Sequence, residues 1–199
     1  MSGMGAIILA GGESRRMGFD KALLPYAGKT LLEEIVQRGR PFFEEIYVVV
    51  DQAKKTKRLD LSGAKVFEDV VPKAGPLAGL YTGLCHSAYP LNMVFTVDMP
   101  FVDGACILEL KHAATENQSD VFCFETSDGN VQPFPGIYAK ECLRWMQLLM
   151  DQNTRSMKRL FQIVDWRAIP AASEKERVFK NLNQCEDYWN TLDLQGKAP

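Results

Sequence analysis

The chain has 199 residues, of which 46% are hydrophobic and 24% charged, and its formal net charge at pH 7 is -2. This length supports one well-buried core, and we expect a single domain spanning residues 1–199. A small acidic charge argues against a nucleic-acid surface, which needs clustered cations. Since no apolar run is long enough to span a bilayer and no signal-peptide pattern opens the chain, we also expect a cytoplasmic protein without a membrane partner.

The first predicted strand, residues 6–10, runs into a glycine-rich segment followed by cations. Gly11 and Gly12 have no Cβ, so their backbone N–H groups can approach an anion closely. Three cations come next along the chain: Arg15, Arg16 and Lys21. The segment therefore predicts a polyphosphate site, with plain solvation as the alternative role of each cation.

Two common nucleotide-binding loops do not fit this segment. A P-loop places a second glycine and then Lys-Ser or Lys-Thr four residues after its first glycine, but here Met17 occupies that position and Ala22 follows Lys21. The dinucleotide fingerprint Gly-x-Gly-x-x-Gly is absent as well. The predicted phosphate site is of another type.

Apolar runs alternate with helical patterns along the rest of the chain. This alternation predicts an α/β protein, a three-layer sandwich around a mostly parallel, Rossmann-like sheet. Thr30 and Glu33 have the spacing of a capping box and predict a helix that ends before Pro41. Further helices are predicted from residue 76, near 104–114, 140–150 and 155–162, and after 184. Further strands are predicted at 46–50, 65–67, 93–97, 121–124, within 131–139, and at 164–169.

Three of the predicted strands end in a carboxylate, namely Asp51, Asp69 and Asp98. Parallel strands bring their carboxyl ends to one edge of the sheet, where α/β proteins bind ligands. Mg²⁺ commonly takes one or two carboxylates together with substrate phosphates and water, so Asp98 is a candidate metal ligand. The alternative is an aspartate that caps a helix or a turn.

Gly79 and Gly83 share one face of the helix predicted from residue 76. Each costs about 1 kcal/mol relative to alanine within a helix, so a close approach is expected there. Either tight packing on the sheet or contact with a ligand explains these glycines.

The five cysteines are odd in number and form no Cys-x-x-Cys pair: Cys85, Cys106, Cys123, Cys142 and Cys185. They fit neither a zinc site nor a disulfide framework. We expect reduced, mostly buried thiols.

The opening segment closely resembles the signature of the molybdenum cofactor guanylyltransferases, a family of the nucleotidyltransferase superfamily. The matching residues are Leu9-Ala10-Gly11-Gly12, Arg15-Arg16-Met17-Gly18 and Asp20-Lys21. A second block, in which Asp69 precedes Gly75-Pro76-Leu77-Ala78-Gly79, resembles a nucleotide-binding segment of the same family. The resemblance extends from Gly5 to about Tyr188.

Two later segments continue this resemblance. Residues 132–138 resemble the family's strand near the acceptor side, and Asn181 and Asn183 resemble its Asn-x-Asn pair, although Asn183 equally suits a helix cap. Arg155 would share one face of the predicted helix at 155–162 with Lys158 and Arg159. That face can meet a pterin phosphate or simply be a solvated basic surface.

One position departs from the family pattern. Related enzymes often carry asparagine at the end of the second strand, whereas this chain has Asp51. A carboxylate only accepts hydrogen bonds, and it adds negative charge beside the expected phosphates. We therefore expect Asp51 to contact a ribose or base donor instead.

The resemblance implies an Mg²⁺-dependent enzyme that transfers GMP from GTP to the terminal phosphate of molybdopterin or Mo-molybdopterin, forming molybdopterin-guanine dinucleotide and pyrophosphate. The implied catalytic residues are Lys21, Asp98 and Arg15, with Asp98 as metal ligand. The implied nucleotide-binding residues are Leu9, Ala10, Gly11, Gly12, Lys21, Asp51, Asp69, Gly75, Gly79 and Asp98. The expected acceptor-binding residues are Asn181, Asn183 and Arg155.

Other expected partners are cofactor-biosynthesis proteins and apo-molybdoenzymes. Two alternatives remain open at this point. One is a cytidylyltransferase or sugar-phosphate nucleotidyltransferase of the same fold. The other is a non-catalytic partner that binds nucleotide or cofactor.

Overall fold

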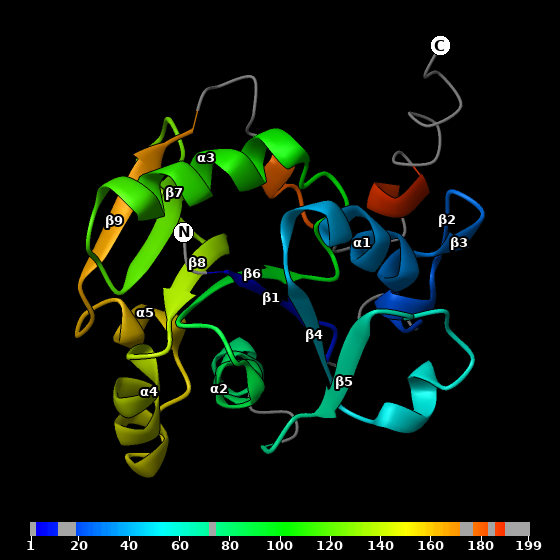
Figure 1. Cartoon of the computed structure of the whole chain (residues 1–199), viewed down its shortest axis with the longest axis horizontal. Helices are drawn as coiled ribbons and strands as arrows, with labels where there is room; N and C mark the ends of the chain where they lie inside the picture. The colour runs from blue at the N-terminus through cyan, green and yellow to red at the C-terminus, as the bar shows by residue number, and fades with distance from the viewer. Residues whose placement is uncertain (1–2, 12–18, 72–74, 172–176, 183–185, 190–199) are drawn as a thin grey trace.

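The computed structural model describes residues 3–11, 19–71, 75–171, 177–182 and 186–189. The strands of its central sheet are β1 (Gly5–Leu9), β4 (Glu45–Val50), β5 (Ala64–Glu68), β6 (Leu91–Thr96), β7 (Val121–Glu125), β8 (Val131–Ala139) and β9 (Trp166–Pro170). The helices are α1 (Leu31–Gly39), α2 (Pro76–His86), α3 (Gly104–Glu116), α4 (Cys142–Asp151) and α5 (Met157–Leu160). The described residues form a seven-stranded sheet in the order β5-β4-β1-β6-β8-β7-β9, with α1 and α3 over one face and α2 and α4 over the other (Figure 1). The predicted three-layer α/β sandwich is confirmed.

Four neighbouring strands of the sheet run in parallel, namely β5, β4, β1 and β6. In the register of these strands, Leu9 lies opposite Val49 of β4 and Thr96 of β6. Strand β8 runs antiparallel to β6 and β7, and β9 is again parallel to β7. The sheet is thus mostly parallel, as predicted, and the carboxyl ends of its four parallel strands are level with one another.

The central strands are buried on both faces, which explains why they are continuous apolar runs. Ile8 and Val48 point into the core beneath α1 and α3, whereas Ile7 and Tyr47 point into the core beneath α2 and α4. All four side chains are fully buried. A one-residue shift of register would exchange the two faces, so this alternation specifies how the strands pair.

Tight packing on the sheet accounts for the two glycines of α2. A Cβ added to Gly83 would lie 2.5 Å from Ile7 Cγ2, and one added to Gly79 would lie 3.3 Å from Leu9 Cδ2. The first distance is incompatible with a side chain unless β1 or α2 moves. Of the two explanations left open by the sequence, close approach to the sheet is the one observed, and a ligand contact of Gly79 stays a prediction.

Helix starts follow their capping residues. Thr30 caps α1, and its hydroxyl and backbone exchange hydrogen bonds with Glu33 in the predicted capping box. The Asp103 carboxylate accepts a hydrogen bond from Cys106 N–H and caps α3. Short elements that we did not predict surround α1: the 3-10 helix η1 (Lys21–Leu23), the strands β2 (Pro25–Tyr26) and β3 (Lys29–Thr30), and the 3-10 helices η2 (Arg40–Phe42) and η3 (Ala53–Thr56).

The helix predicted at 155–162 is wrong in its extent. The chain leaves α4 through Asn153, which has a positive φ of 58°, and Thr154 N–H returns to Leu149 O. Helix α5 begins only at Met157, so Arg155 lies in the connection before it and does not share a helical face with Lys158 and Arg159. The last predicted strand also starts later than expected, at Trp166. A helical turn at 186–189 agrees with the predicted terminal helix.

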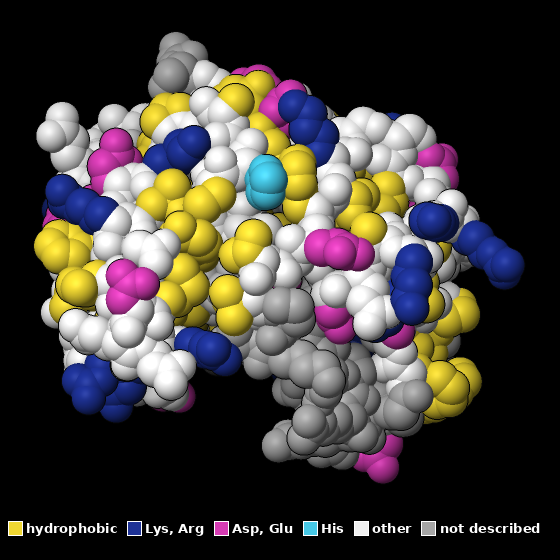
Figure 2. Space-filling model, turned by 90° about the horizontal axis from the view of Figure 1, so that it is seen from below, with side chains coloured by type: hydrophobic (Ala, Val, Ile, Leu, Met, Phe, Trp, Pro, Cys, Tyr) yellow, Lys and Arg dark blue, Asp and Glu magenta, His cyan; other side chains and the backbone are white. Residues whose placement is uncertain are grey.

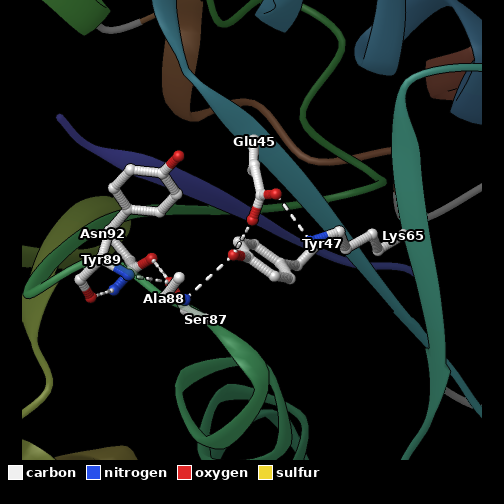
Figure 3. A network of polar contacts seen from close by, with 7 residues as sticks. All are labelled: Glu45, Tyr47, Lys65, Ser87, Ala88, Tyr89 and Asn92. Carbon is white, nitrogen blue, oxygen red and sulfur yellow. Dashed lines mark hydrogen bonds and ion pairs between the residues drawn. The ribbon is translucent and has the colours of Figure 1, made fainter.

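A polar network closes the opposite edge of the sheet, at the amino ends of β4 and β6 (Figure 3). The Tyr47 hydroxyl donates to Glu45 and accepts from Ala88 N–H at 3.0 Å. Asn92, which is fully buried, accepts from Ser87 Oγ at 2.5 Å and donates to Tyr89 O at 2.9 Å. Because buried polar groups cost free energy unless they are paired, this network ties the end of α2 to the sheet.

The described cysteines behave as predicted. Cys106, Cys123 and Cys142 are buried free thiols, whereas Cys85 is exposed. Burial raises the pKa of Cys123 and of Cys142 to about 12, so both stay protonated at neutral pH.

No helix in the described ranges is both long and apolar enough to cross a membrane. Seen from below, hydrophobic side chains gather on the left of the molecule, and acidic and basic side chains stand close together on the right (Figure 2).

Candidate active site

The carboxyl ends of β5, β4, β1 and β6 form one continuous edge, which we call the carboxyl edge. Backbone hydrogen bonds continue the ladders past the strand ends: Asp69 N–H donates to Val50 O, and Ala10 N–H donates to Val49 O, each at 2.8 Å. Asp69, Asp51 and Asp98 therefore follow β5, β4 and β6 at this edge, as predicted. Ala10 and Gly11 follow β1 and therefore lie between Asp51 and Asp98 along this edge.

Gly11 is required by its neighbour on β4. A Cβ at Gly11 would lie 2.9 Å from Asp51 Oδ1 and 3.3 Å from Asp51 N. The Asp51 carboxylate thus lies against the backbone at the point where β1 leaves the sheet. Any larger residue at position 11 would displace this carboxylate. Gly12 and Arg15, which complete the predicted phosphate segment, lie outside the described residues.

Lys21 and Asp98 form the central ion pair of the carboxyl edge. Lys21 Nζ lies 3.0 Å from Asp98 Oδ2, and the two side chains are only 16% and 20% exposed. Thr96, the last residue of β6, donates a hydrogen bond from its hydroxyl to Asp98 Oδ1 in the turn that follows. The structure thus brings together the two residues predicted to be catalytic, one from η1 and one from the end of β6.

A second ion-pair group stands beside this one. Lys55 Nζ, from η3, lies 3.1 Å from Asp20 Oδ2 and 3.5 Å from Asp51 Oδ2. Asp20 also caps η1 by accepting a hydrogen bond from Ala22 N–H at 3.2 Å. Read from β4 to β6, the charges alternate in sign: Asp51, Lys55, Asp20, Lys21 and Asp98.

Asp69 is the least solvated of the strand-end carboxylates. Its Oδ1 accepts hydrogen bonds from Thr82 Oγ1 at 3.0 Å and from Val71 N–H at 3.1 Å. Burial is the largest cause that raises the pKa of Asp69, and the negative charge of Asp51 raises it further. This carboxylate is therefore held under α2 at an electrostatic cost.

Gly75 begins α2 in a backbone conformation that favours glycine, with φ of 80°. A Cβ there would meet no atom within 4 Å, so the conformation and not the space requires glycine. Pro76 follows at the first helical position, where its missing N–H is tolerated. The predicted Gly75 to Gly79 block is thus a helix start at the carboxyl edge.

A segment late in the chain docks against Asp98. Leu182 N–H donates to Asp98 O at 2.9 Å, and the Arg177 guanidinium stands 4.3 Å from the centre of the Phe101 ring. This contact places Asn181, which is exposed, immediately beside a residue bound to the Asp98 backbone. Asn183 lies outside the described residues. Arg155 is exposed between α4 and α5, and among the described residues no contact joins it to Lys21, Asp51 or Asp98.

A magnesium ion carried by a nucleotide fits this edge. Within the described parts of the chain, no group of three or more His, Cys, Asp or Glu side chains is arranged to hold a metal ion. Mg²⁺ commonly needs only one or two protein carboxylates when phosphates supply its other ligands. Asp98 offers such a carboxylate, partly exposed, and its present partner Lys21 is a flexible cation that can move to a phosphate.

Three contact residues escaped the sequence reasoning: Asp20, Lys55 and Thr96. Thr96 is two residues before Asp98, a separation at which a hydroxyl can reach a carboxylate across a turn, and this spacing was a usable signal. Lys55 is four residues after Asp51, a spacing that brings side chains together in a helical segment. Asp20 belongs to the quoted Asp-Lys pair, but its contact with Lys55 depends on the fold.

The chain resembles known proteins along most of its length. A family model described as MobA-like NTP transferase domain matches residues 6–171. A probable molybdenum cofactor guanylyltransferase from Geobacillus sp. is 29% identical over 196 residues, which cover 94% of this chain and 97% of that protein. Its sequence match is therefore nearly complete in both directions.

Two solved structures show the same fold. Molybdopterin-guanine dinucleotide biosynthesis protein A from Archaeoglobus fulgidus aligns with a TM-score of 0.83 and 21% identity, covering 98% of this chain and 100% of that chain. The 2-C-methyl-D-erythritol 4-phosphate cytidylyltransferase from Thermus thermophilus aligns with a TM-score of 0.71 and 17% identity, covering 98% of both chains. The fold is thus shared by proteins whose names specify different bases.

Proposed function

Since this chain belongs to the MobA-like NTP transferase family and is a nucleotidyltransferase, we propose that it transfers GMP from GTP to the terminal phosphate of molybdopterin, or of Mo-molybdopterin. The products are molybdopterin-guanine dinucleotide and pyrophosphate. Support for the substrates comes from the name of the relative that matches nearly the whole chain. Support for the chemistry comes from the carboxyl edge, and above all from the ion pair of Lys21 and Asp98.

In the proposed reaction, an oxygen of the acceptor phosphate attacks the α-phosphorus of GTP. The bond from that phosphorus to the bridging oxygen of the β-phosphate breaks, and pyrophosphate leaves with the electron pair. The acceptor phosphate is already anionic, so the site needs no residue to remove a proton from it. Positioning of the two phosphates and neutralisation of their charge are the main tasks of the protein.

Lys21 and Asp98 change partners when the nucleotide binds. The Lys21 ammonium turns to the triphosphate and neutralises the charge that develops on the leaving pyrophosphate. Asp98, held in orientation by the Thr96 hydroxyl, is then available to bind a cation. Asp98 would hold Mg²⁺, and the ion would supply Lewis-acid stabilisation of the phosphate charge. The Gly11 backbone at the end of β1 is proposed to face the phosphates, and Arg15 is a second proposed phosphate cation.

The acceptor enters from the side of the late segment in this proposal. Asn181 stands beside Leu182, whose backbone is bonded to Asp98, and this nearness supports Asn181 as a candidate for contact with the acceptor phosphate. An amide both donates and accepts hydrogen bonds, which suits a pterin or a phosphate. Asn183 is proposed for the same task from its place in the sequence. Arg155 is the weaker acceptor candidate, because it is not part of a basic helical face.

The experiment that tests the proposal is turnover with defined nucleotides and acceptors. The protein is incubated with Mo-molybdopterin or molybdopterin, Mg²⁺ and one of GTP, CTP, ATP or UTP, and pyrophosphate release is measured. We expect release with GTP, its loss on chelation of Mg²⁺, and its return when Mg²⁺ is added back. A preference for CTP would instead establish a cytidylyltransferase. Tight binding of GTP without turnover would establish a binding partner.

A further inference from the structure

Lys55 joins two carboxylates that belong to different segments of the carboxyl edge. Asp51 ends β4, whereas Asp20 precedes η1, and the Lys55 ammonium lies within 3.5 Å of both. The hydrogen bond with Asp20 is the largest cause that raises the pKa of Lys55. Lys55 is therefore fully charged at neutral pH, and the pairing with Asp20 and Asp51 favours that charge.

The charge balance of the carboxyl edge indicates what the pairing of Lys55 with Asp20 and Asp51 does. Its described part carries the carboxylates of Asp20, Asp51, Asp69 and Asp98, with Glu68 at the end of β5 bonded to Ala53 N–H, and the ion pairs there supply two ammonium groups, from Lys21 and Lys55. A triphosphate brings several further negative charges to the same place. Unpaired carboxylates within a few ångströms of it would repel it appreciably, because the low dielectric near a protein surface strengthens such interactions.

Asp51 is the carboxylate for which this repulsion matters most. Its Oδ1 lies against the backbone of Gly11, where a Cβ would be only 2.9 Å away. The same backbone is where the phosphates are proposed to lie. The Lys55 ammonium lies on the other carboxylate oxygen of Asp51 and also pairs with Asp20, so it lowers the combined charge of the two carboxylates from -2 to -1.

We propose that Lys55 is an electrostatic positioning residue for the triphosphate: by pairing with Asp20 and Asp51 it cancels carboxylate charge beside Gly11. The inference rests on the proposed function, since it takes this edge to be the triphosphate site. Lys55 itself acts through Asp20 and Asp51, while Lys21 pairs with Asp98. Its loss should therefore affect nucleotide binding more than the chemical step.

The first test replaces Lys55 by a neutral side chain of similar length. In Lys55→Met we expect the KM for GTP to rise about tenfold at low salt, with kcat within about twofold of wild type. The rise should shrink at high ionic strength, where salt screens charges at a partly exposed site. Lys55→Arg keeps the charge and should restore most of the affinity. Lys54→Met, on the exposed neighbouring lysine of η3, is the matched control and should leave KM unchanged.

The second test separates charge compensation from a merely structural link. If Lys55 mainly cancels the charge of Asp51, the substitution Lys55→Met should cost about threefold or less in an Asp51→Asn background. A structural link between η1 and η3 would instead make Lys55→Met equally costly in both backgrounds. Equal cost would overturn the proposal, as would an unchanged KM in Lys55→Met.

A third measurement keeps this inference independent of the identity of the substrates. Binding of inorganic tripolyphosphate and of GTP to wild type, Lys55→Met and Lys54→Met is measured by titration calorimetry. We expect about tenfold weaker binding of both ligands to Lys55→Met alone. If the wild type releases no pyrophosphate from GTP but this difference persists, the proposed reaction is wrong and the role of Lys55 stands. If wild type binds no tripolyphosphate, or Lys55→Met binds it equally well, the role of Lys55 is wrong.

Discussion

The two edges of the sheet use polar side chains in opposite ways. At the amino edge, the Tyr47 hydroxyl and the Asn92 amide are both enclosed in a network of hydrogen bonds that joins α2 to the strands (Figure 3). At the carboxyl edge, Lys21 pairs with Asp98 in an ion pair that remains partly exposed. Asp69 is half-buried there, and this burial is the largest cause that raises its pKa.

This difference separates stability from function within one sheet. The amino-edge network supplies hydrogen-bond partners to buried polar groups, so its loss should lower the free energy of unfolding. The carboxyl edge gathers charges of alternating sign that remain partly exposed and can exchange partners, so its loss should appear in activity. A site that binds anions next to carboxylates is expected to be less stable than its surroundings.

The largest expected effect is at the carboxyl edge. Asp98→Asn should lower the rate of pyrophosphate release by roughly 100-fold to 1,000-fold, because a neutral amide holds a cation poorly. The melting temperature should change little. Asp103→Asn, five residues later, is the matched control: asparagine caps α3 as well as aspartate does, so both activity and stability should be kept. Near-normal turnover of Asp98→Asn would remove Asp98 from the mechanism.

The next effect concerns the packing between the two edges. Gly83→Ala should destabilise the protein by about 1–3 kcal/mol, because the new Cβ would be 2.5 Å from Ile7 Cγ2. Chemical denaturation followed by circular dichroism measures this loss, and activity per folded molecule should stay the same. Cys85→Ala, at an exposed position of the same helix, should leave the unfolding midpoint unchanged. A fully stable Gly83→Ala would show that α2 can shift away from β1.

A smaller loss is expected at the amino edge. Tyr47→Phe removes the hydroxyl that accepts from Ala88 N–H and donates to Glu45, and should cost about 1 kcal/mol of unfolding free energy. Tyr89→Phe is its control, since the Tyr89 hydroxyl takes no part in the network drawn in Figure 3. Turnover by both variants should equal that of wild type. Loss of activity in Tyr47→Phe without loss of stability would contradict the division between the edges.

The smallest expected effect is a gain in stability, whereas the preceding variants lose stability or activity. The raised pKa of folded Asp69 means that its protonated form stabilises the fold fully below the unfolded pKa, and that this stabilisation is lost as the pH rises through the folded pKa. Asp69→Asn should therefore raise the melting temperature at pH 7 by roughly 1–3 °C, and the gain should vanish in acid. Its amide oxygen can still accept from Thr82 and Val71.

Asp128→Asn is the control for the expected rise in melting temperature of Asp69→Asn. Hydrogen bonds from Thr126 and Asn130 lower the pKa of Asp128, so its carboxylate form is the one that the fold favours. This variant should show no gain at pH 7. Thermal melts over a series of pH values distinguish the two variants, and a destabilised Asp69→Asn would show that the carboxylate itself is needed there.

The carboxyl edge was largely predictable from the sequence, because continuous apolar runs that end at Asp51, Asp69 and Asp98 are typical of doubly covered parallel strands. The contact between Lys21 and Asp98 was not, since the two residues are distant in sequence and meet only through the strand order. Their roles rest on resemblance and remain predictions.

The amino-edge network escaped the sequence reasoning for a related reason. Tyr47 has the pattern of an ordinary strand residue, and Asn92 lies near the start of another strand. Nothing in the sequence around either residue predicts that the two belong to one network. The helix predicted over 155–162 failed because apolar spacing says nothing about Asn153, whose left-handed backbone ends the preceding helix. Local pattern therefore predicted the elements, and tertiary contacts decided where they stop.

The hydrogen bond from Leu182 N–H to the Asp98 carbonyl also makes the turn after β6 depend on a segment near the far end of the described chain. During synthesis, Asp98 is made well before Leu182, so the Asp98 carbonyl acquires this partner only once the late segment has been made. The turn that carries Asp98 is therefore completed by one of the last described segments of the chain.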